Sequence, residues 1–127
     1  MEIAVKQLFA YPVAIFNLED VFDDFFEKER ANQVWAQNGS DHCVNNYSSK
    51  SMNVLDGYED EKKTLMECVN LYKNEVMKWH KSELKITTSW LTKTEHGGFS
   101  KSHFHYNSVI SGVLYDAANG SDGVGNI

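Results

Sequence analysis

Two histidines separated by a single residue, His103 and His105, are the side chains of this sequence best suited to chemistry. Side chains alternate between the two faces of a strand, so both imidazoles are expected on one face while Phe104 points to the other. Imidazole is a common ligand of iron, zinc and copper, and a pair held on a rigid strand loses little entropy when it chelates. The spacing therefore predicts half of a metal site. The alternative is a solvent-facing pair that only forms hydrogen bonds.

The residues around this pair form a longer pattern. Ser89-Trp90 is followed by a polar turn with Gly97-Gly98, and then by His103-x-His105-x-Asn107-Ser108-Val109-Ile110-Ser111-Gly112-Val113-x-Tyr115. This pattern resembles the central signature of a family of iron(II)/2-oxoglutarate oxygenases common in marine bacteria and their phages. A weaker resemblance extends to Leu8–Val13 and to Val54-Leu55. It covers most of this chain but not all of the family's domain.

The resemblance implies a double-stranded β-helix, a jelly-roll or cupin-like core, that binds Fe(II) and uses 2-oxoglutarate as co-substrate. His103 and His105 would be the metal ligands. Asn107, Ser111 and Tyr115 share their face of a regular strand and would offer hydrogen bonds to the bound keto acid, although each also fits an ordinary strand position. In most of the superfamily a carboxylate stands where His105 stands here. The site would then hold iron through nitrogen donors and carry less negative charge.

The family is expected to continue through further strands that carry a distal His and a basic residue that anchors the 2-oxoglutarate carboxylate. Neither appears before Ile127, so we expect the chain to be the N-terminal and central portion of the domain. Glu95 and His96, in the turn before the pair, are candidate substitute ligands. Two other interpretations stay open. One is a cupin-type metal-binding protein, because Gly97 precedes the His pair by six residues, and the other is a non-catalytic truncated domain.

The elements that must position the pair follow from the spacing of apolar residues. Three- and four-residue spacing predicts helices from Glu19 to Trp35 and from Glu59 to Lys81. Alternation predicts one or two strands within residues 3–16 and a strand over 84–91. After a turn at Thr94–Gly98, one long strand or two short ones broken near Asn107 are expected over Lys101–Tyr115. The polar connection between Gly39 and Gly57 has no clear period and is expected to hold a short strand at Val44–Tyr47. Residues 119–127 are expected to form a loop or to be disordered. The expected fold is a single α+β domain, 1–127, with a β-rich jelly-roll core braced by two N-terminal helices.

Composition limits the class of protein. The chain has 127 residues, 42% of them hydrophobic and 24% charged, which is typical of one soluble globular domain. A net charge of -6 argues against a nucleic-acid partner, because such proteins need a basic surface. The sequence lacks a signal-peptide pattern and any apolar run near the ~20 residues of a membrane span. We therefore expect no membrane partner and a cytoplasmic address, in the host cytoplasm if a phage encodes the chain.

The remaining reactive side chains are expected to be structural or solvated. Cys43 and Cys68 form no metal-binding spacing and are expected to be reduced thiols, with Cys68 in the core. His42 and His80 are expected at the surface.

The expected ligand is a small-molecule or peptide substrate. Because the predicted strands are too few to close a jelly roll, the chain is expected either to be a fragment or to form a homodimer through an open sheet edge.

Overall fold

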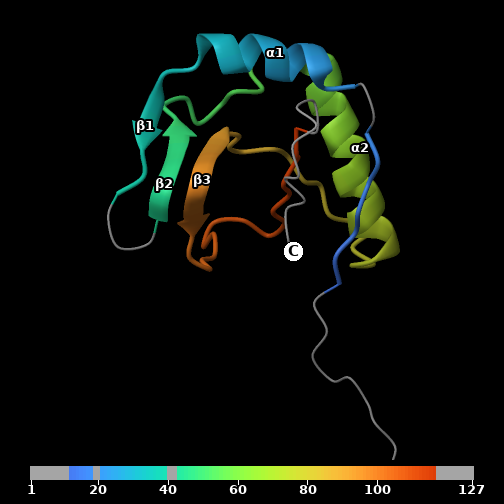
Figure 1. The fold of residues 1–127 in the computed structure, drawn as a ribbon. Helices are drawn as coiled ribbons and strands as arrows, with labels where there is room; N and C mark the ends of the chain where they lie inside the picture. The colour runs from blue at the N-terminus through green and yellow to red at the C-terminus, as the bar shows by residue number, and fades with distance from the viewer. Residues whose placement is uncertain (1–11, 19–20, 40–42, 117–127) are drawn as a thin grey trace, which may run out of the picture.

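The computed structural model describes residues 12–18, 21–39 and 43–116. This part of the chain is an α+β structure with two helices and a three-stranded antiparallel sheet in the order β1-β2-β3. In Figure 1, α1 crosses the top, the sheet lies on the left and α2 lies on the right, with the segments that flank β3 running between them. The expected α+β class and its two helices are confirmed. In the described part no second sheet faces the first, so the jelly roll stays a prediction.

Helix α1 (Asp23–Asn32) is shorter than the sequence predicts. Its first turn is acidic and its last turn is basic, which suits the dipole of a helix. Gln33 has extended backbone, and the β-branched and aromatic residues that follow lead into strand β1 (Trp35–Gln37). The predicted helix end at Trp35 is therefore wrong, because Trp35 pairs in the sheet. The predicted start at Glu19 lies outside the described residues.

Helix α2 (Glu59–Glu75) begins where predicted but ends before Lys81. Lys78 has a left-handed backbone with φ of 58°, which turns the chain away from the helix axis. The buried ammonium of Lys73 donates a hydrogen bond to the carbonyl of Ser82 at 2.7 Å. This bond ties the chain back over the last helical turn. The final turn of the predicted helix is thus replaced by a closed turn that satisfies a buried charge.

Strand β2 (Cys43–Ser49) contains the predicted Val44–Tyr47 strand and pairs with both neighbours. Strand β3 (Thr92–Ser100) includes the stretch predicted as a turn. Opposite β3, Asn46 pairs with Thr94 and Val44 pairs with Phe99, so one residue of β2 faces the four residues 95–98 of β3. The predicted turn is therefore a bulge inside a strand.

Two glycines make this bulge possible. Gly97 has φ of 71°, a conformation that favours glycine. A Cβ atom on Gly98 would lie 2.7 Å from the carbonyl oxygen of Asn45, which is too close for any larger residue without movement of the backbone. The Gly-Gly pair suggested a turn, but the chain keeps its direction and resumes its pairing with β2 after the bulge.

Two predicted strands do not form. Residues 84–91 are extended but join no sheet, apart from one isolated parallel bridge between Asn53 and Ser89. Residues 101–115 lack strand pairing and turn at Tyr106 and Asn107, close to the predicted break. Within 3–16, the described residues 12–16 form no strand, and the rest lies outside the described part. Alternation thus predicted strands in segments that have no partner strand in the described structure.

The core is small and lies where α1 meets the turn before α2. Phe22, Phe25, Val54 and Leu55 are buried. Partly buried side chains from the segment before α1, from in and around both helices and from the segments that flank β3 pack against them, namely Leu18, Phe26, Tyr58, Leu65, Ile86, Leu91 and Leu114. Phe25 makes edge-to-face contacts with Phe22 and Phe26 and with the Tyr58 ring, at a centroid distance of 4.8 Å from the last. Phe25 is the centre of this cluster.

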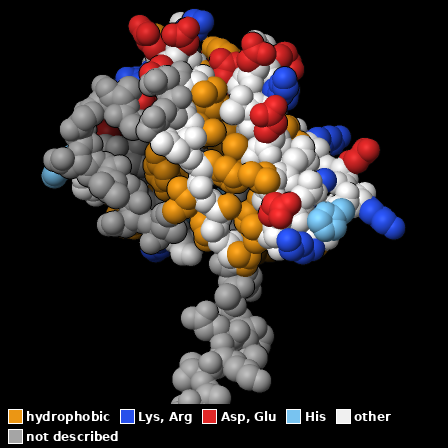
Figure 2. All heavy atoms as spheres, turned by 90° about the vertical axis from the view of Figure 1, so that its right-hand side faces the viewer, with side chains coloured by type: hydrophobic (Ala, Val, Ile, Leu, Met, Phe, Trp, Pro, Cys, Tyr) orange, Lys and Arg blue, Asp and Glu red, His pale blue; other side chains and the backbone are white. Residues whose placement is uncertain are grey.

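Figure 2 shows the side of the molecule that carries α2, where hydrophobic side chains gather and acidic side chains lie above them. Exposed apolar residues of this region include Leu71 on the helix and Val13 and Ile15 in the segment before α1. The Tyr72 hydroxyl donates a hydrogen bond of 2.8 Å to the carbonyl of Pro12, which holds that segment against the helix. Neither helix of the described chain has the length and apolar character needed to cross a bilayer.

Tyr58 gives a first testable prediction because it links the two helices. Its hydroxyl donates a hydrogen bond of 2.7 Å to Glu29 of α1. That bond, together with burial and the charges of Glu29 and Glu61, raises the pKa of Tyr58 to about 12. Tyr58→Phe should lower the free energy of unfolding by about 1 kcal/mol in urea at neutral pH, as is usual for one lost hydrogen bond.

The same contact predicts a pH dependence with a definite sign. The folded-state pKa of Tyr58 lies above the usual tyrosine pKa of 10.0, so the stability that the Tyr58 hydroxyl contributes is complete below pH 10 and is lost as the pH rises towards 12. The stability difference between the native chain and Tyr58→Phe should therefore shrink across this interval in urea titrations. A difference that stays constant across it would show that the hydroxyl is not held by Glu29.

Candidate metal site

The two imidazoles of the His-x-His pair lie side by side. Their ring centroids are 5.1 Å apart with an interplanar angle of 82°. Phe104 and Tyr106 form a second contact between alternate residues, with centroids 4.3 Å apart. The alternation expected of extended backbone therefore holds through this stretch, although it is a loop and not a strand. Both histidines are exposed and accessible to a ligand from solvent.

One histidine has a defined tautomer. Nδ1 of His103 lies 2.9 Å from the carbonyl oxygen of Lys101. A carbonyl only accepts hydrogen bonds, so Nδ1 is the donor, and in the neutral ring Nε2 carries the lone pair. A backbone carbonyl in this position is a common way for proteins to orient a metal-ligating imidazole. His103 therefore presents Nε2 as a nitrogen donor.

The second histidine is positioned by a tryptophan. The His105 ring lies 5.3 Å from the Trp90 ring, tilted by 58°. Trp90 is half-buried, and through this ring contact the first part of the sequence pattern meets the second. The sequence pattern includes Ser89-Trp90 but does not show that Trp90 is the neighbour of His105. Only the path of the chain between residues 91 and 105 brings them together.

Hydrogen bonds on both sides hold Trp90 in place. Ser89 donates its backbone N–H to Met52 at 2.9 Å, and its carbonyl accepts from Val54 at 3.0 Å. On the other side, the N–H of Leu91 donates to the hydroxyl of Ser49 at 3.0 Å, and the N–H of Ser49 donates to the carbonyl of Leu91 at 2.9 Å. The backbone that carries Trp90 is therefore fixed at the residues immediately before and after it.

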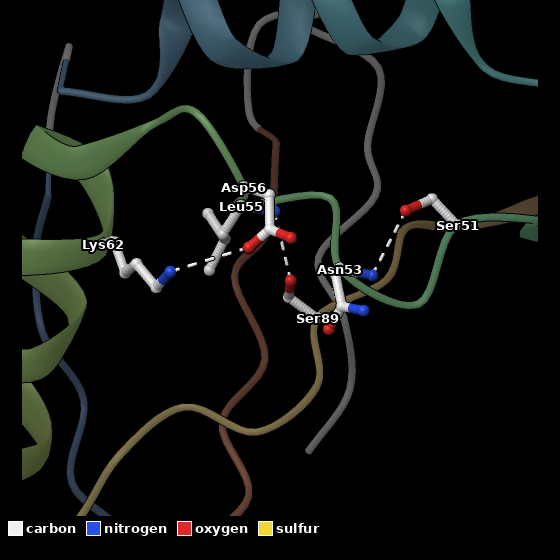
Figure 3. A network of polar contacts seen from close by, with 6 residues as sticks. All are labelled: Ser51, Asn53, Leu55, Asp56, Lys62 and Ser89. Carbon is white, nitrogen blue, oxygen red and sulfur yellow. Dashed lines mark hydrogen bonds and ion pairs between the residues drawn. The ribbon is translucent and has the colours of Figure 1, made fainter.

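Figure 3 shows how this support reaches the core and α2. The hydroxyl of Ser89 accepts a hydrogen bond of 3.1 Å from the backbone N–H of Leu55, a core residue. In the same turn, Ser51 accepts from the N–H of Asn53, and Asp56 forms an ion pair of 3.6 Å with Lys62 of α2. The short polar residues of 49–53, which carry no periodicity in the sequence, therefore serve as hydrogen-bonding partners.

The loop that carries the histidines is held at both ends. At its start, Ser100 pairs with Cys43 in the sheet. At its end, Leu114 packs against the core cluster, and Asp116 forms an ion pair with Arg30 of α1. The imidazole pair lies between these two attachment points, so its position relative to the sheet and α1 is limited by the fold.

The residues predicted to bind the co-substrate are not gathered around the pair. Asn107 lies in the turn after His105, where the N–H of Ser108 donates to the carbonyl of His105 at 3.2 Å. Ser111 and Tyr115 are exposed farther along the loop. No hydrogen bond among the described residues joins these three side chains to the imidazoles. A regular strand would have aligned them with the histidines, and the turn at Asn107 removes that alignment.

The described residues supply two metal donors and no third. No group of three or more His, Cys, Asp or Glu side chains in residues 12–18, 21–39 and 43–116 is arranged to hold a metal ion. The candidate substitute Glu95 forms an ion pair of 3.1 Å with Lys93, and His96 is exposed in the bulge of β3. His80 is exposed, and His42 lies outside the described residues. Two neutral imidazoles suit Fe(II), Co(II) or Zn(II), but alone they make a weak site.

Neither cysteine joins the site. Both are free thiols and half-buried. Burial raises the pKa of the Cys68 thiol, which keeps it protonated and agrees with a structural role on α2. The thiol of Cys43 lies 3.5 Å from the hydroxyl of Ser100 at the end of β3.

No protein-family model, curated protein or solved structure matches this chain.

Proposed function

We propose that the chain is an Fe(II)- and 2-oxoglutarate-dependent dioxygenase or a portion of one. One observation carries the proposal. His103 and His105 are exposed, and their imidazole ring centroids lie 5.1 Å apart. Nδ1 of His103 bonds to a backbone carbonyl, which leaves Nε2 for a ligand. The resemblance of the surrounding sequence to the signature of these oxygenases supports iron as the metal.

His103 and His105 would hold the metal, and Trp90 would orient the ring of His105. Asn107 and Ser111 would offer hydrogen bonds to 2-oxoglutarate, together with Tyr115, once the loop closes around it. When bound, Fe(II) would supply the redox chemistry by which 2-oxoglutarate, dioxygen and a C–H substrate become succinate, carbon dioxide and the hydroxylated product. The resemblance of the sequence also supports the finer proposal about the fold. In it, the three-stranded sheet belongs to a double-stranded β-helix whose other strands carry the third ligand.

This proposal predicts weak binding and poor turnover by the chain itself. Purified protein incubated anaerobically with Fe(II) should bind 2-oxoglutarate only when the metal is present. After dioxygen is added, succinate should form slowly or not at all, because a missing ligand removes both affinity and geometric control. Equilibrium dialysis with labelled 2-oxoglutarate measures the first quantity, and chromatography of the acids measures the second.

The His103→Ala/His105→Ala double variant is the control for both measurements. It should lose the metal-dependent part of 2-oxoglutarate binding. If the native chain binds 2-oxoglutarate no better with Fe(II) than without it, the oxygenase proposal is wrong, and metal binding alone would favour the cupin-type interpretation. Fast succinate formation that requires both histidines would instead show that the site is complete, through Glu95, His96 or a second subunit.

A further inference from the structure

A groove of about 290 Å³ lies between helix α2 and residues 84–86. Neither histidine of the candidate metal site lines it. Its apolar lining comes from Met66 on the helix and from Leu84 and Ile86 on the extended segment. All three side chains are half-buried, and Ile86 also packs against the core cluster. The apolar wall is therefore held by the fold and is present before any ligand binds.

The rim of this groove is positively charged in a chain whose net charge is -6. Lys62, Lys63 and Lys85 line it, and the one acidic lining residue is Glu59. Lys62 is partly neutralised by Asp56 at 3.6 Å, whereas Lys63 and Lys85 form no ion pair with any described residue. Three lysines against one glutamate leave two positive charges at the groove, or one when Asp56 is included.

We propose that this groove binds a monocarboxylate with an apolar body, such as a short-chain fatty acid. The apolar wall of Met66, Leu84 and Ile86 would take the body, and Lys63 and Lys85 would bind the carboxylate. Lysine suits this task because its ammonium is a point charge on a flexible apolar stem. This inference does not depend on the proposed oxygenase activity.

Two features favour this ligand class over other anions. A phosphate or an inorganic ion would leave the apolar wall without a partner. A long polyanion would extend beyond the groove and be repelled by a protein with a net charge of -6. A single negative charge on an apolar body matches both the residual charge and the lining.

Octanoate is a suitable probe, with octanamide as its uncharged analogue of equal length. Titrating octanoate into ¹⁵N-labelled protein should shift amide resonances at residues 59–66 and 84–86 and leave those of β1 and β2 unchanged. Octanamide should bind at least ~10-fold more weakly, because it loses the attraction to the lysines. Shifts that are absent up to the solubility limit of octanoate, or equal affinity for the two probes, would overturn the proposal.

A pair of double variants separates local charge from net charge. Lys63→Glu/Lys85→Glu reverses the two rim charges and should weaken octanoate binding at least ~10-fold. Lys28→Glu/Lys50→Glu changes the net charge by the same amount at exposed positions outside the groove and should leave the affinity unchanged. Circular dichroism of both variants checks that they are folded. Equal weakening in the two variants would assign the effect to overall charge and contradict the groove.

Discussion

His103→Ala should abolish stoichiometric Fe(II) or Co(II) binding by this chain. The described residues provide two imidazole donors and no third, so removing one leaves a single ligand and ends chelation. Loss of an outer-shell partner alone typically weakens metal affinity ~10 to 100-fold, and loss of a direct donor should weaken it by ~100-fold or more. Anaerobic titration followed by calorimetry, or by the visible absorption of Co(II), measures the change.

The fold should survive this substitution. His103 is exposed, and its one hydrogen bond in the described structure goes to a neighbouring carbonyl, so the free energy of unfolding should change by no more than about 0.5 kcal/mol. His80→Ala is the matched control, because His80 is also exposed but lies beyond the end of α2. Equal metal affinity in the native chain and in His103→Ala would remove this residue from the site. A loss in His80→Ala would show that binding is not specific to the pair.

Phe25→Ala should be the most destabilising single substitution in the core. The Phe25 side chain is 3% exposed and makes edge-to-face contacts with Phe22, Phe26 and Tyr58. Truncating a buried phenylalanine usually costs about 3–5 kcal/mol, through lost burial and the cavity that remains. With only four buried hydrophobic residues in the described part, the structure has little other packing to absorb this loss.

Urea unfolding followed by circular dichroism tests this expectation. Native domains are stable by only about 5–15 kcal/mol, so Phe25→Ala should be partly unfolded or unfold at much lower urea. Phe104→Ala removes the same side chain from a position that is 67% exposed and should change the free energy of unfolding by less than about 1 kcal/mol. Similar effects of the two substitutions would mean that the cluster around Phe25 is not the core.

The helices were predictable because their signal is local. Apolar residues at three- and four-residue spacing placed α2 at its start, and the acidic first turns of both helices agreed with their dipoles. Their ends were not predictable. Trp35 belongs to a strand because a sheet partner is available, and the α2 terminus depends on a bond between Lys73 and Ser82 that no periodicity shows.

The strands were harder because pairing is a long-range property. Alternation over 84–91 and 101–115 predicted strands that do not form, because a strand also needs a neighbour in register. The partner of β2 turned out to be Thr92–Ser100, a stretch whose two glycines suggested a turn. β3 is an edge of the described sheet and is mostly exposed, so the homodimer through an open edge stays a prediction that light scattering can test.

For the candidate site, the sequence predicted that the two histidines share one face of the chain. It did not predict which residues surround them. His105 contacts Trp90 because Ser49 and Ser89 fix the backbone on either side of the tryptophan, and these bonds join residues about forty positions apart in the sequence. The sequence predicted a break near Asn107, but as a gap between two strands and not as a turn in a loop. This turn separates the proposed co-substrate residues from the histidines in the described structure.

The attachment of the histidine loop at both ends has a thermodynamic consequence. Ser100 is held by the sheet and Leu114 by the core, so the loop is already closed before a metal arrives. Closing a flexible loop costs conformational entropy that grows with the logarithm of its length. In this structure the chain has already lost that entropy when it folds. Metal binding then has to order only residues 101–113. Amide hydrogen exchange should slow in this segment on metal binding, while the exchange of α2 stays as it was.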